Sequence, residues 1–258
     1  MDSEMENIPL TEFDPDRDAI IDPSKHIRYK ELSEYCVIPY YGTVKENLVS
    51  EGILEKVHEV GSILMPVDIY KLHHDGKDIT VVFPTACGAP LAAVFMEQLI
   101  GFGCRKFIAC GSAGVLNSEL GKDEIIIPNG AVRDEGTSYH YLPPSRTIEA
   151  DSTVLRKLEA VLQKHHITYE TGLTWTTDAP FRETKTKIAR RNAEGCLTVE
   201  MEYASFLAVA IFRNVKFGQY LLVGDDVSGD EWDHRNWADT SPAHDKLFWL
   251  SVEACLTL

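Results

Sequence analysis

Two pairs of acidic residues follow or begin apolar segments, where carboxyl groups are suited to chemistry. Glu200 and Glu202 flank Met201 at the start of a predicted helix whose other residues are apolar. Buried carboxylates are costly unless a partner compensates them. The pair is therefore either helix-terminal charge that complements the helix dipole or a site that accepts hydrogen bonds from sugar hydroxyls.

The second acidic pair is Asp225-Asp226, which ends the apolar run Leu221 to Val223. A carboxyl group at such a strand end is suited to general acid catalysis, because partial burial raises its pKa toward neutrality. The alternative is an Asx turn or a helix cap. The sequence alone leaves both interpretations open.

Two further segments have the composition of a binding site. Cys110 to Gly114 directly follows a predicted strand, and its small residues let backbone amides approach an anion or a sugar; plain packing is the alternative. The segment Thr176 to Thr184 contains Phe181, which could lay an aromatic ring against a planar base.

Alternating strands and helices must position these segments. The strands that we expect are Ile79–Phe83, Phe107–Cys110, ended by Gly111 to Gly114, then Glu124–Pro128, Ile167–Thr177 and Gln219–Val223. The helices that we expect are Leu91–Ile100, a helix through Val154 and Leu162 capped by Asp151 or Ser152, Glu200–Arg213, and one after Ser241-Pro242. This alternation predicts a three-layer α/β domain. Ligands of such folds bind at the carboxyl ends of strands.

Composition restricts the class of protein. Residues 1–34, with three prolines among many acids, read as an N-terminal arm before a single domain at 35–258. The net charge of −15 repels nucleic acids and anionic membranes, and no apolar run approaches the roughly 20 residues of a membrane span. The polar, acidic N-terminus is neither a signal nor a transit peptide, and the six cysteines form no C-x-x-C pair. We expect a cytoplasmic protein with free thiols and no metal.

In their shared order, these segments resemble the nucleoside phosphorylase superfamily, which includes purine nucleoside phosphorylases, uridine phosphorylases and methylthioadenosine nucleosidases. The resemblance runs from about Val81 to Val227. The matching segments are Gly88-Ala89-Pro90 with Met96 to Leu99 (G-x-P and E-E-L), Cys110 to Gly114 (G-[ST]-x-G), Ala131 to Tyr141, Val199 to Glu202 (V-x-M-E) and Gly224-Asp225 ([ST]-D).

The resemblance implies a central mixed twisted sheet flanked by helices, in a homo-oligomer that is hexameric or built from dimers. By the same resemblance, Glu202 and Asp225 are the catalytic residues. Glu202 would hold the ribose hydroxyls, and Asp225 would donate a proton to the departing base, most naturally at N7 of a purine. These roles suit an oxocarbenium-like transition state, in which positive ribose and a negative leaving base both need stabilisation.

The resemblance also assigns substrate-binding residues. Met201, beside Glu200, would pack under the ribose, Phe181 would contact the base, and His26 would reach a neighbouring subunit's ribose 5′ end. The phosphate would face three residues of the glycine-rich loop, namely Gly111, Ser112 and Ala113. The implied reaction is phosphorolysis to free base and ribose 1-phosphate, with inorganic phosphate as co-substrate and no cofactor.

The sequence departs from the family at the phosphate-binding positions. The arginine expected two residues before the loop glycine is Ala109, and the early G-D-x-x-R turn is replaced near Tyr40 to Glu46. The candidate substitutes are Lys45, Arg133 and Arg182. The glutamine-and-arginine pair with which uridine phosphorylases read uracil is not evident after Phe181, which favours a purine. Hydrolytic nucleosidase, uridine phosphorylase and non-catalytic nucleoside binding remain as alternatives.

Overall fold

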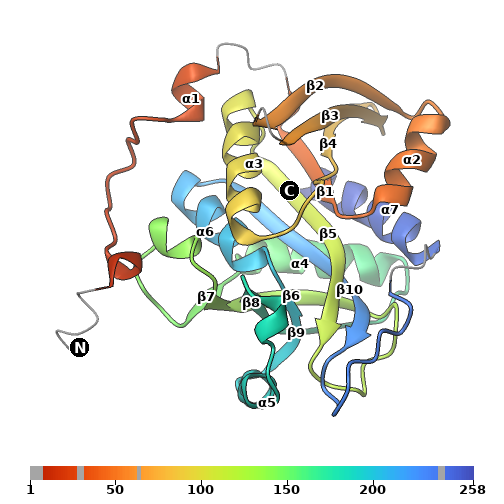
Figure 1. The fold of residues 1–258 in the computed structure, drawn as a ribbon. Helices are drawn as coiled ribbons and strands as arrows, with labels where there is room; N and C mark the ends of the chain where they lie inside the picture. The colour runs from red at the N-terminus through yellow and green to blue at the C-terminus, as the bar shows by residue number, and fades with distance from the viewer. Residues whose placement is uncertain (1–7, 28–31, 63–64, 238–241) are drawn as a thin grey trace.

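The computed structural model describes residues 8–27, 32–62, 65–237 and 242–258 (Figure 1). Its strands are β1 (Tyr35–Pro39), β2 (Leu54–Ser62), β3 (Met65–His74), β4 (Lys77–Val82), β5 (Lys106–Val115), β6 (Ile125–Asp134), β7 (Thr147–Glu149), β8 (Tyr169–Thr177), β9 (Cys196–Glu200) and β10 (Lys216–Asp226). Its α-helices are α1 (Pro23–His26), α2 (Gly42–Ser50), α3 (Ala89–Phe102), α4 (Ser152–Lys164), α5 (Lys185–Ala193), α6 (Tyr203–Arg213) and α7 (Pro242–Thr257). Short 3₁₀ helices are η2 (Pro9–Thr11), η3 (Ser138–His140) and η4 (Pro180–Arg182).

The strands form one mixed 10-stranded sheet in the order β10-β6-β8-β9-β5-β1-β4-β3-β2, with β7 beside β6. Because β10 also pairs with β5, the strands β5, β10, β6, β8 and β9 close into a ring, and the strands β1, β4, β3 and β2 continue from β5 as an extension. The β1–β5, β5–β10 and β8–β9 pairs are parallel. The ring therefore brings segments that are distant in sequence to one end of the sheet.

Helices cover both faces of this sheet. Along β5, Phe107 and Ala109 pack into the apolar cluster that contains α3 and α6, whereas Ile108 and Cys110 pack into the one that contains α2, α4 and α7. This alternation is the period of a strand buried on both sides. It confirms the predicted three-layer α/β domain with a mixed central sheet. No helix in the described ranges is both long and apolar enough to cross a membrane.

Most predicted elements are confirmed. The helix α4 begins after Asp151, whose carboxylate accepts a hydrogen bond from Thr153 N (2.8 Å). The last helix, α7, starts at Pro242. Its proline stands at the first position, where a missing N–H costs nothing.

Several predicted boundaries are wrong. The strands expected at Glu124–Pro128 and Gln219–Val223 extend over Ile125–Asp134 and Lys216–Asp226, and two other differences affect the site. Gly111 to Gly114 does not end its strand, because β5 continues to Val115 and pairs there with β10 and β9. Small side chains in this stretch mark a close approach of neighbouring strands rather than a turn. The helix expected from Glu200 starts instead at Tyr203, because Glu200 is the last residue of β9.

The N-terminal segment lies along one side of the molecule, where Figure 1 shows it in red beside α3 and α6. The Arg17 guanidinium lies 5.5 Å from the centre of the Phe212 ring. Arg213 of α6 is 3.5 Å from the Asp22 carboxylate and 2.9 Å from that of Glu97. The first strand starts at Tyr35, the first residue of the predicted domain.

Candidate active site

A cleft with two lobes opens at the carboxyl ends of β5, β9 and β10. One cavity of about 550 Å³ includes Tyr41 and Glu202 in its lining, and we call it the Tyr41 lobe. The other, of about 700 Å³, includes Phe181 and Asp225, and we call it the Asp225 lobe. The lobes adjoin each other, because Ser112, Glu200, Met201 and Trp237 line both. The structure thus brings together the predicted residues of β5, the β9–α6 turn and the end of β10.

Glu202 stands immediately before α6, at its N-cap position, and lines the Tyr41 lobe. Only 7% of the residue is exposed, and its Oε1 accepts a hydrogen bond from Gly88 N (2.6 Å). Burial raises the pKa of Glu202. A carboxylate held in place by a backbone amide, yet lining a cavity, is arranged to accept hydrogen bonds from ligand hydroxyls.

Glu200, which we predicted to bind substrate, has both carboxyl oxygens engaged by the fold. Its Oε1 accepts from Thr176 Oγ1 (2.5 Å), and its Oε2 accepts from the backbone N–H groups of Glu202 (2.7 Å) and Tyr203 (2.6 Å). Burial, followed by repulsion from Glu202, raises the pKa of Glu200 to about 8. The side chain therefore fixes the β9–α6 turn that presents Glu202.

Removing the Glu200 carboxyl group should destabilise the protein. Glu200→Ala leaves two buried N–H groups and the Thr176 hydroxyl without their acceptor, and such losses cost about 1–3 kcal/mol. We expect the free energy of urea unfolding to fall by that amount. The matched control is Glu170→Ala at an exposed position of β8, which should change it by less than about 0.5 kcal/mol. Equal stability of the two variants would contradict the positioning role.

A register shift at the end of β10 turns Asp225 into the cleft. Val223 pairs with Ala113 and Asp226 with Val115, so Gly224 and Asp225 are the irregular residues between them. Such bulges redirect a side chain out of the regular strand. Asp225 Oδ2 accepts a hydrogen bond from Trp232 Nε1 (2.6 Å).

The second loop glycine makes room for this arrangement. A Cβ atom at Gly114 would lie 3.3 Å from Asp225 Oδ1 and 3.1 Å from Val199 Cγ1. The glycine at this position therefore lets β5 approach β9 and the end of β10 closely. This close approach gives a physical reason for glycine at the last position of the G-[ST]-x-G pattern.

The neighbouring Asp226 is occupied elsewhere. Its Oδ1 accepts from the backbone and the hydroxyl of Ser228 (2.8 and 2.6 Å), and its Oδ2 lies 2.6 Å from Arg235 NH2. Asp226 thus organises the loop after β10. The structure places Asp225, our predicted proton donor, rather than Asp226 in the cleft.

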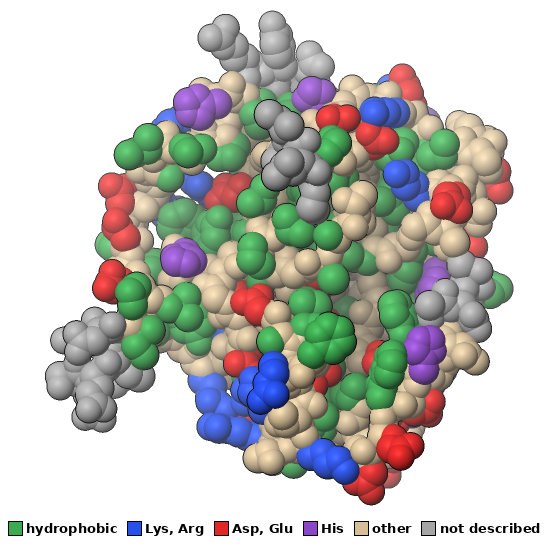
Figure 2. Space-filling model, in the orientation of Figure 1, with side chains coloured by type: hydrophobic (Ala, Val, Ile, Leu, Met, Phe, Trp, Pro, Cys, Tyr) green, Lys and Arg blue, Asp and Glu red, His purple; other side chains and the backbone are tan. Residues whose placement is uncertain are grey.

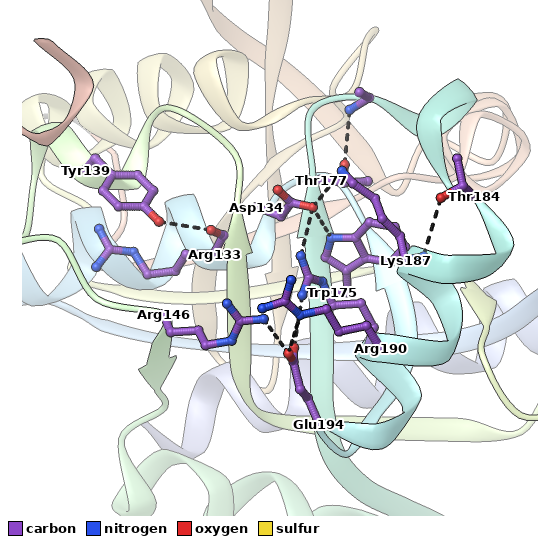
Figure 3. A network of polar contacts seen from close by, with 12 residues as sticks. Arg133, Asp134, Tyr139, Arg146, Trp175, Thr177, Thr184, Lys187, Arg190 and Glu194 are labelled. Carbon is purple, nitrogen blue, oxygen red and sulfur yellow. Dashed lines mark hydrogen bonds and ion pairs between the residues drawn. The ribbon is translucent and has the colours of Figure 1, made fainter. Parts of the chain in front are cut away.

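The segment between β8 and α5 forms one wall of the Asp225 lobe. Phe181 of η4 lies on this wall and is 99% exposed, so its ring is free to contact a ligand. Below the wall, Asp134 Oδ2 accepts from Trp175 Nε1 (3.0 Å), Lys187 Nζ (3.1 Å) and Arg191 NH2 (3.1 Å), as Figure 3 shows in part. These three donors hold Asp134 ionised and lower its pKa, although burial opposes this. The network anchors α5 against β6 and β8, and therefore fixes the wall.

A second network on α5 engages more of its cations. Glu194 accepts from Arg190 Nε (3.2 Å) and Arg191 NH1 (3.0 Å), and it also pairs with Arg146. Figure 2 shows the basic side chains gathered over α5 on this face of the molecule. The carboxylates that pair with Arg190 and Arg191 thus lie beside α5 and not in the Tyr41 lobe.

The Tyr41 lobe contains Gly111 and Ser112, as predicted for a phosphate site, whereas Ala113 lies in the Asp225 lobe. The Tyr41 ring stacks on His244, with ring centres 4.1 Å apart and an interplanar angle of 12°. Burial lowers the pKa of His244, which makes the imidazole a neutral group at pH 7. No lysine or arginine lines this lobe in the part of the chain that the structure describes.

Position 109, where the family carries an arginine, lies inside the packed core. Ala109 is fully buried and pairs across the sheet with Gln219 of β10. Gln219 lines the Tyr41 lobe, is 3% exposed, and its Oε1 has no hydrogen-bond partner among the described residues. Gln219 does not stand out in the sequence, because it lies within an otherwise apolar strand.

None of the three candidate substitutes for that arginine lines the lobe. Lys45 Nζ lies 5.6 Å from the centre of the Tyr70 ring. Arg133 is buried and donates to Ser138 Oγ (2.9 Å), Ser145 Oγ (2.7 Å) and neighbouring carbonyls. Arg182 belongs to η4 and lines neither lobe. Each of these basic residues lies on a segment that places its side chain outside the lining of the Tyr41 lobe.

His26 lies apart from the cleft of its own chain. It lines a separate cavity of about 1000 Å³ with Tyr35, His58 and Phe102, and Pro23 and Ile27 of its segment pack at Gly101 of α3. Its predicted role at a neighbouring subunit's ribose, like the predicted homo-oligomer, stays a prediction. Within the described ranges, no group of three or more His, Cys, Asp or Glu side chains is arranged to hold a metal ion.

Comparison with known proteins agrees with this architecture. Residues 39–250 match the model of the Phosphorylase superfamily. A guanosine phosphorylase of Halorubrum lacusprofundi is 27% identical over 164 residues, which span 63% of this chain and 68% of that protein.

Two solved structures share the fold. Uridine phosphorylase from Vibrio fischeri superposes with a TM-score of 0.74 at 19% identity, covering 93% of this chain and 100% of that one. AMP nucleosidase from Bacteroides thetaiotaomicron gives 0.68 at 22% identity, covering 88% and 89%. With a family match over most of its length and this fold, the chain belongs to the phosphorylase superfamily, whose members include nucleoside phosphorylases.

Proposed function

We propose that this protein cleaves the N-glycosidic bond of a purine nucleoside and transfers the ribosyl group to inorganic phosphate. One observation carries the proposal. The carboxyl groups of Glu202 and Asp225 line opposite lobes of one cleft, and Met201 and Ser112 line the junction between them. A nucleoside across this junction would have its ribose over Met201 and its base in the Asp225 lobe.

The chemistry of bond cleavage fits these positions. As the bond to the base lengthens, positive charge develops on the ribose and negative charge on the base. The buried Glu202 carboxylate would hold the ribose hydroxyls and stabilise the first charge. Asp225, when it carries a proton, would transfer it to N7 of the base and neutralise the second. The exposed Phe181 ring would cover the base.

Phosphate as the acceptor is supported by the start of α2. Gly42 and Thr43, its first two residues, line the Tyr41 lobe, and the side chain of the N-cap residue, Tyr41, makes no capping hydrogen bond in the described structure. Uncapped N–H groups and the helix dipole favour an anion there. Together with the Ser112 hydroxyl they would bind phosphate, although more weakly than an arginine, because charge-assisted hydrogen bonds contribute about 1.5–3 kcal/mol each.

Hydrolysis is the second candidate, and one observation favours it. The Tyr41 lobe has no lysine or arginine in its described lining, whereas Glu46 and Glu202 both belong to that lining. A dianion would meet repulsion there, but a water molecule would not. Gln219 Oε1, buried and without a partner among the described residues, could accept a hydrogen bond from that water.

The sugar product distinguishes the two acceptors. We expect the protein to release base from inosine or guanosine faster as phosphate rises through the millimolar range, with ribose 1-phosphate as the product. The measurement is phosphorus NMR together with chromatography of the base, with and without phosphate. Free ribose, formed at a rate that phosphate does not change, would establish the hydrolase instead. In that case Gln219→Glu and Gln219→Leu test whether this side chain holds the water.

A further inference from the structure

A second carboxyl group lines the Asp225 lobe and has no part in the mechanism above. Glu183, directly after η4, shares the lining of this cavity of about 700 Å³ with Asp225 and Phe181. Its side chain is partly buried. The lobe that would receive the base thus carries two carboxyl groups from different parts of the chain.

The charged neighbours that the structure describes leave Glu183 without a counterion. Lys185 also lines the lobe, but its Nζ is 2.6 Å from the Asp230 carboxylate. Lys187, on the same helix, is paired with Asp134. In the described part of the lining, the other titratable residues are all acidic, namely Glu200, Asp225, Asp230 and Glu231. Among the described residues, no ion pair includes Glu183, and burial followed by repulsion from Asp225 raises its pKa to about 7.

The backbone around Glu183 is held in place. Its N–H donates to Pro180 O (3.2 Å), and the next residue, Thr184, caps α5 by accepting from Lys187 N (3.4 Å). The helix α5 is in turn tied to Asp134 through Lys187 and Arg191. The carboxyl group is therefore presented from a pre-organised segment, as a binding residue requires.

We propose that Glu183 is a second base-contacting residue, which reads the substituent at position 6 of the purine while Asp225 serves the adjacent N7. This inference rests on the proposed function. N7 and the substituent at C6 lie side by side on a purine, so two carboxyl groups that share one lobe can contact both. An ionised carboxylate only accepts hydrogen bonds, whereas a protonated carboxyl group also donates one. Ionised Glu183 thus fits a 6-amino group, and protonated Glu183 fits a 6-oxo group.

The choice between these bases then depends on pH. Below about pH 7, Glu183 holds its proton and favours 6-oxopurines such as inosine; above it, Glu183 is ionised and favours adenosine. We expect the ratio of kcat/KM for adenosine to that for inosine to rise roughly tenfold or more between pH 6 and pH 8, the factor that one charge-assisted hydrogen bond can supply.

The test is Glu183→Gln, whose amide keeps the length of the side chain but does not titrate. In this variant the ratio should be the same at pH 6 and pH 8. The matched control is Glu170→Gln, which removes one exposed charge at the opposite end of β8 and should keep the wild-type rise. Dissociation constants for adenine and hypoxanthine, measured by calorimetry over the same pH range, report base recognition without turnover.

Several results would overturn the inference. One is a wild-type ratio that does not change with pH, in turnover and in base binding alike. Another is a Glu183→Gln ratio that still rises as in Glu170→Gln, and a third is an equal loss for both purines at every pH. If the protein bound adenine and hypoxanthine with the expected pH dependence but cleaved neither adenosine nor inosine, this inference would be supported while the proposed function failed.

Discussion

Replacing Glu202 with glutamine should lower turnover at least about 100-fold, which corresponds to about 3 kcal/mol of transition-state stabilisation. The glutamine oxygen can still accept the hydrogen bond that Gly88 N donates to Glu202 at 2.6 Å. The change thus removes mainly the negative charge that would face the developing positive charge on the ribose. The measurement is kcat and kcat/KM for inosine.

The control for Glu202→Gln is a measurement of the unfolding temperature, which shows whether the variant is still folded. We expect the variant to unfold at a temperature close to that of the wild type, because the backbone contact at Gly88 remains. A variant with normal turnover and intact fold would remove Glu202 from the catalytic machinery. A loss confined to KM would mean that Glu202 binds substrate and transition state equally.

Asp225→Asn should slow inosine cleavage by about 100-fold or more, within the range of general acid catalysis. The same variant should slow 7-methylguanosine by less than about tenfold, because its base already carries a positive charge at N7 and leaves without a proton. The contrast between the two substrates separates proton donation from a general loss of structure. Steady-state rates of base release for both nucleosides provide the measurement.

The adjacent aspartate is the matched control for this experiment. Asp226 contacts Ser228 and Arg235 rather than the cleft, so Asp226→Asn should lower stability and affect both nucleosides equally. If Asp226→Asn instead showed the selective loss with inosine, the proton donor would be Asp226. Equal losses for both substrates in Asp225→Asn would point to a structural role for Asp225.

The sequence was sufficient for the fold class and for the main carboxyl groups. Strand periodicity marks β5 and β10 as buried, and the carboxyl ends of such strands meet at one edge. That rule locates Ser112 and Asp225, and the polar interruption of an apolar segment locates Glu202. The structure brings all three to one cleft.

The remaining site residues depend on contacts between distant segments. Glu183 reaches the neighbourhood of Asp225 only because β10 pairs with both β6 and β5 and closes the ring. In the sequence, Gln219 is a single polar residue in an apolar strand. Only the pairing of β10 with β5 shows that it lies opposite Ala109. Arg133 does not line the cleft, because its guanidinium donates hydrogen bonds to residues of the loop that follows β6, including Ser138 and Ser145. Residue type alone cannot reveal such internal partners.

The proposed cleavage is tested most directly by measuring the release of free base from a purine nucleoside by the wild-type protein over many turnovers. With inosine in excess over protein, we expect hypoxanthine to accumulate far beyond one equivalent per chain, and we expect Glu202→Gln to slow this accumulation at least about 100-fold. Tight binding of nucleoside without any release of base would contradict it, and would identify a binding protein instead of an enzyme.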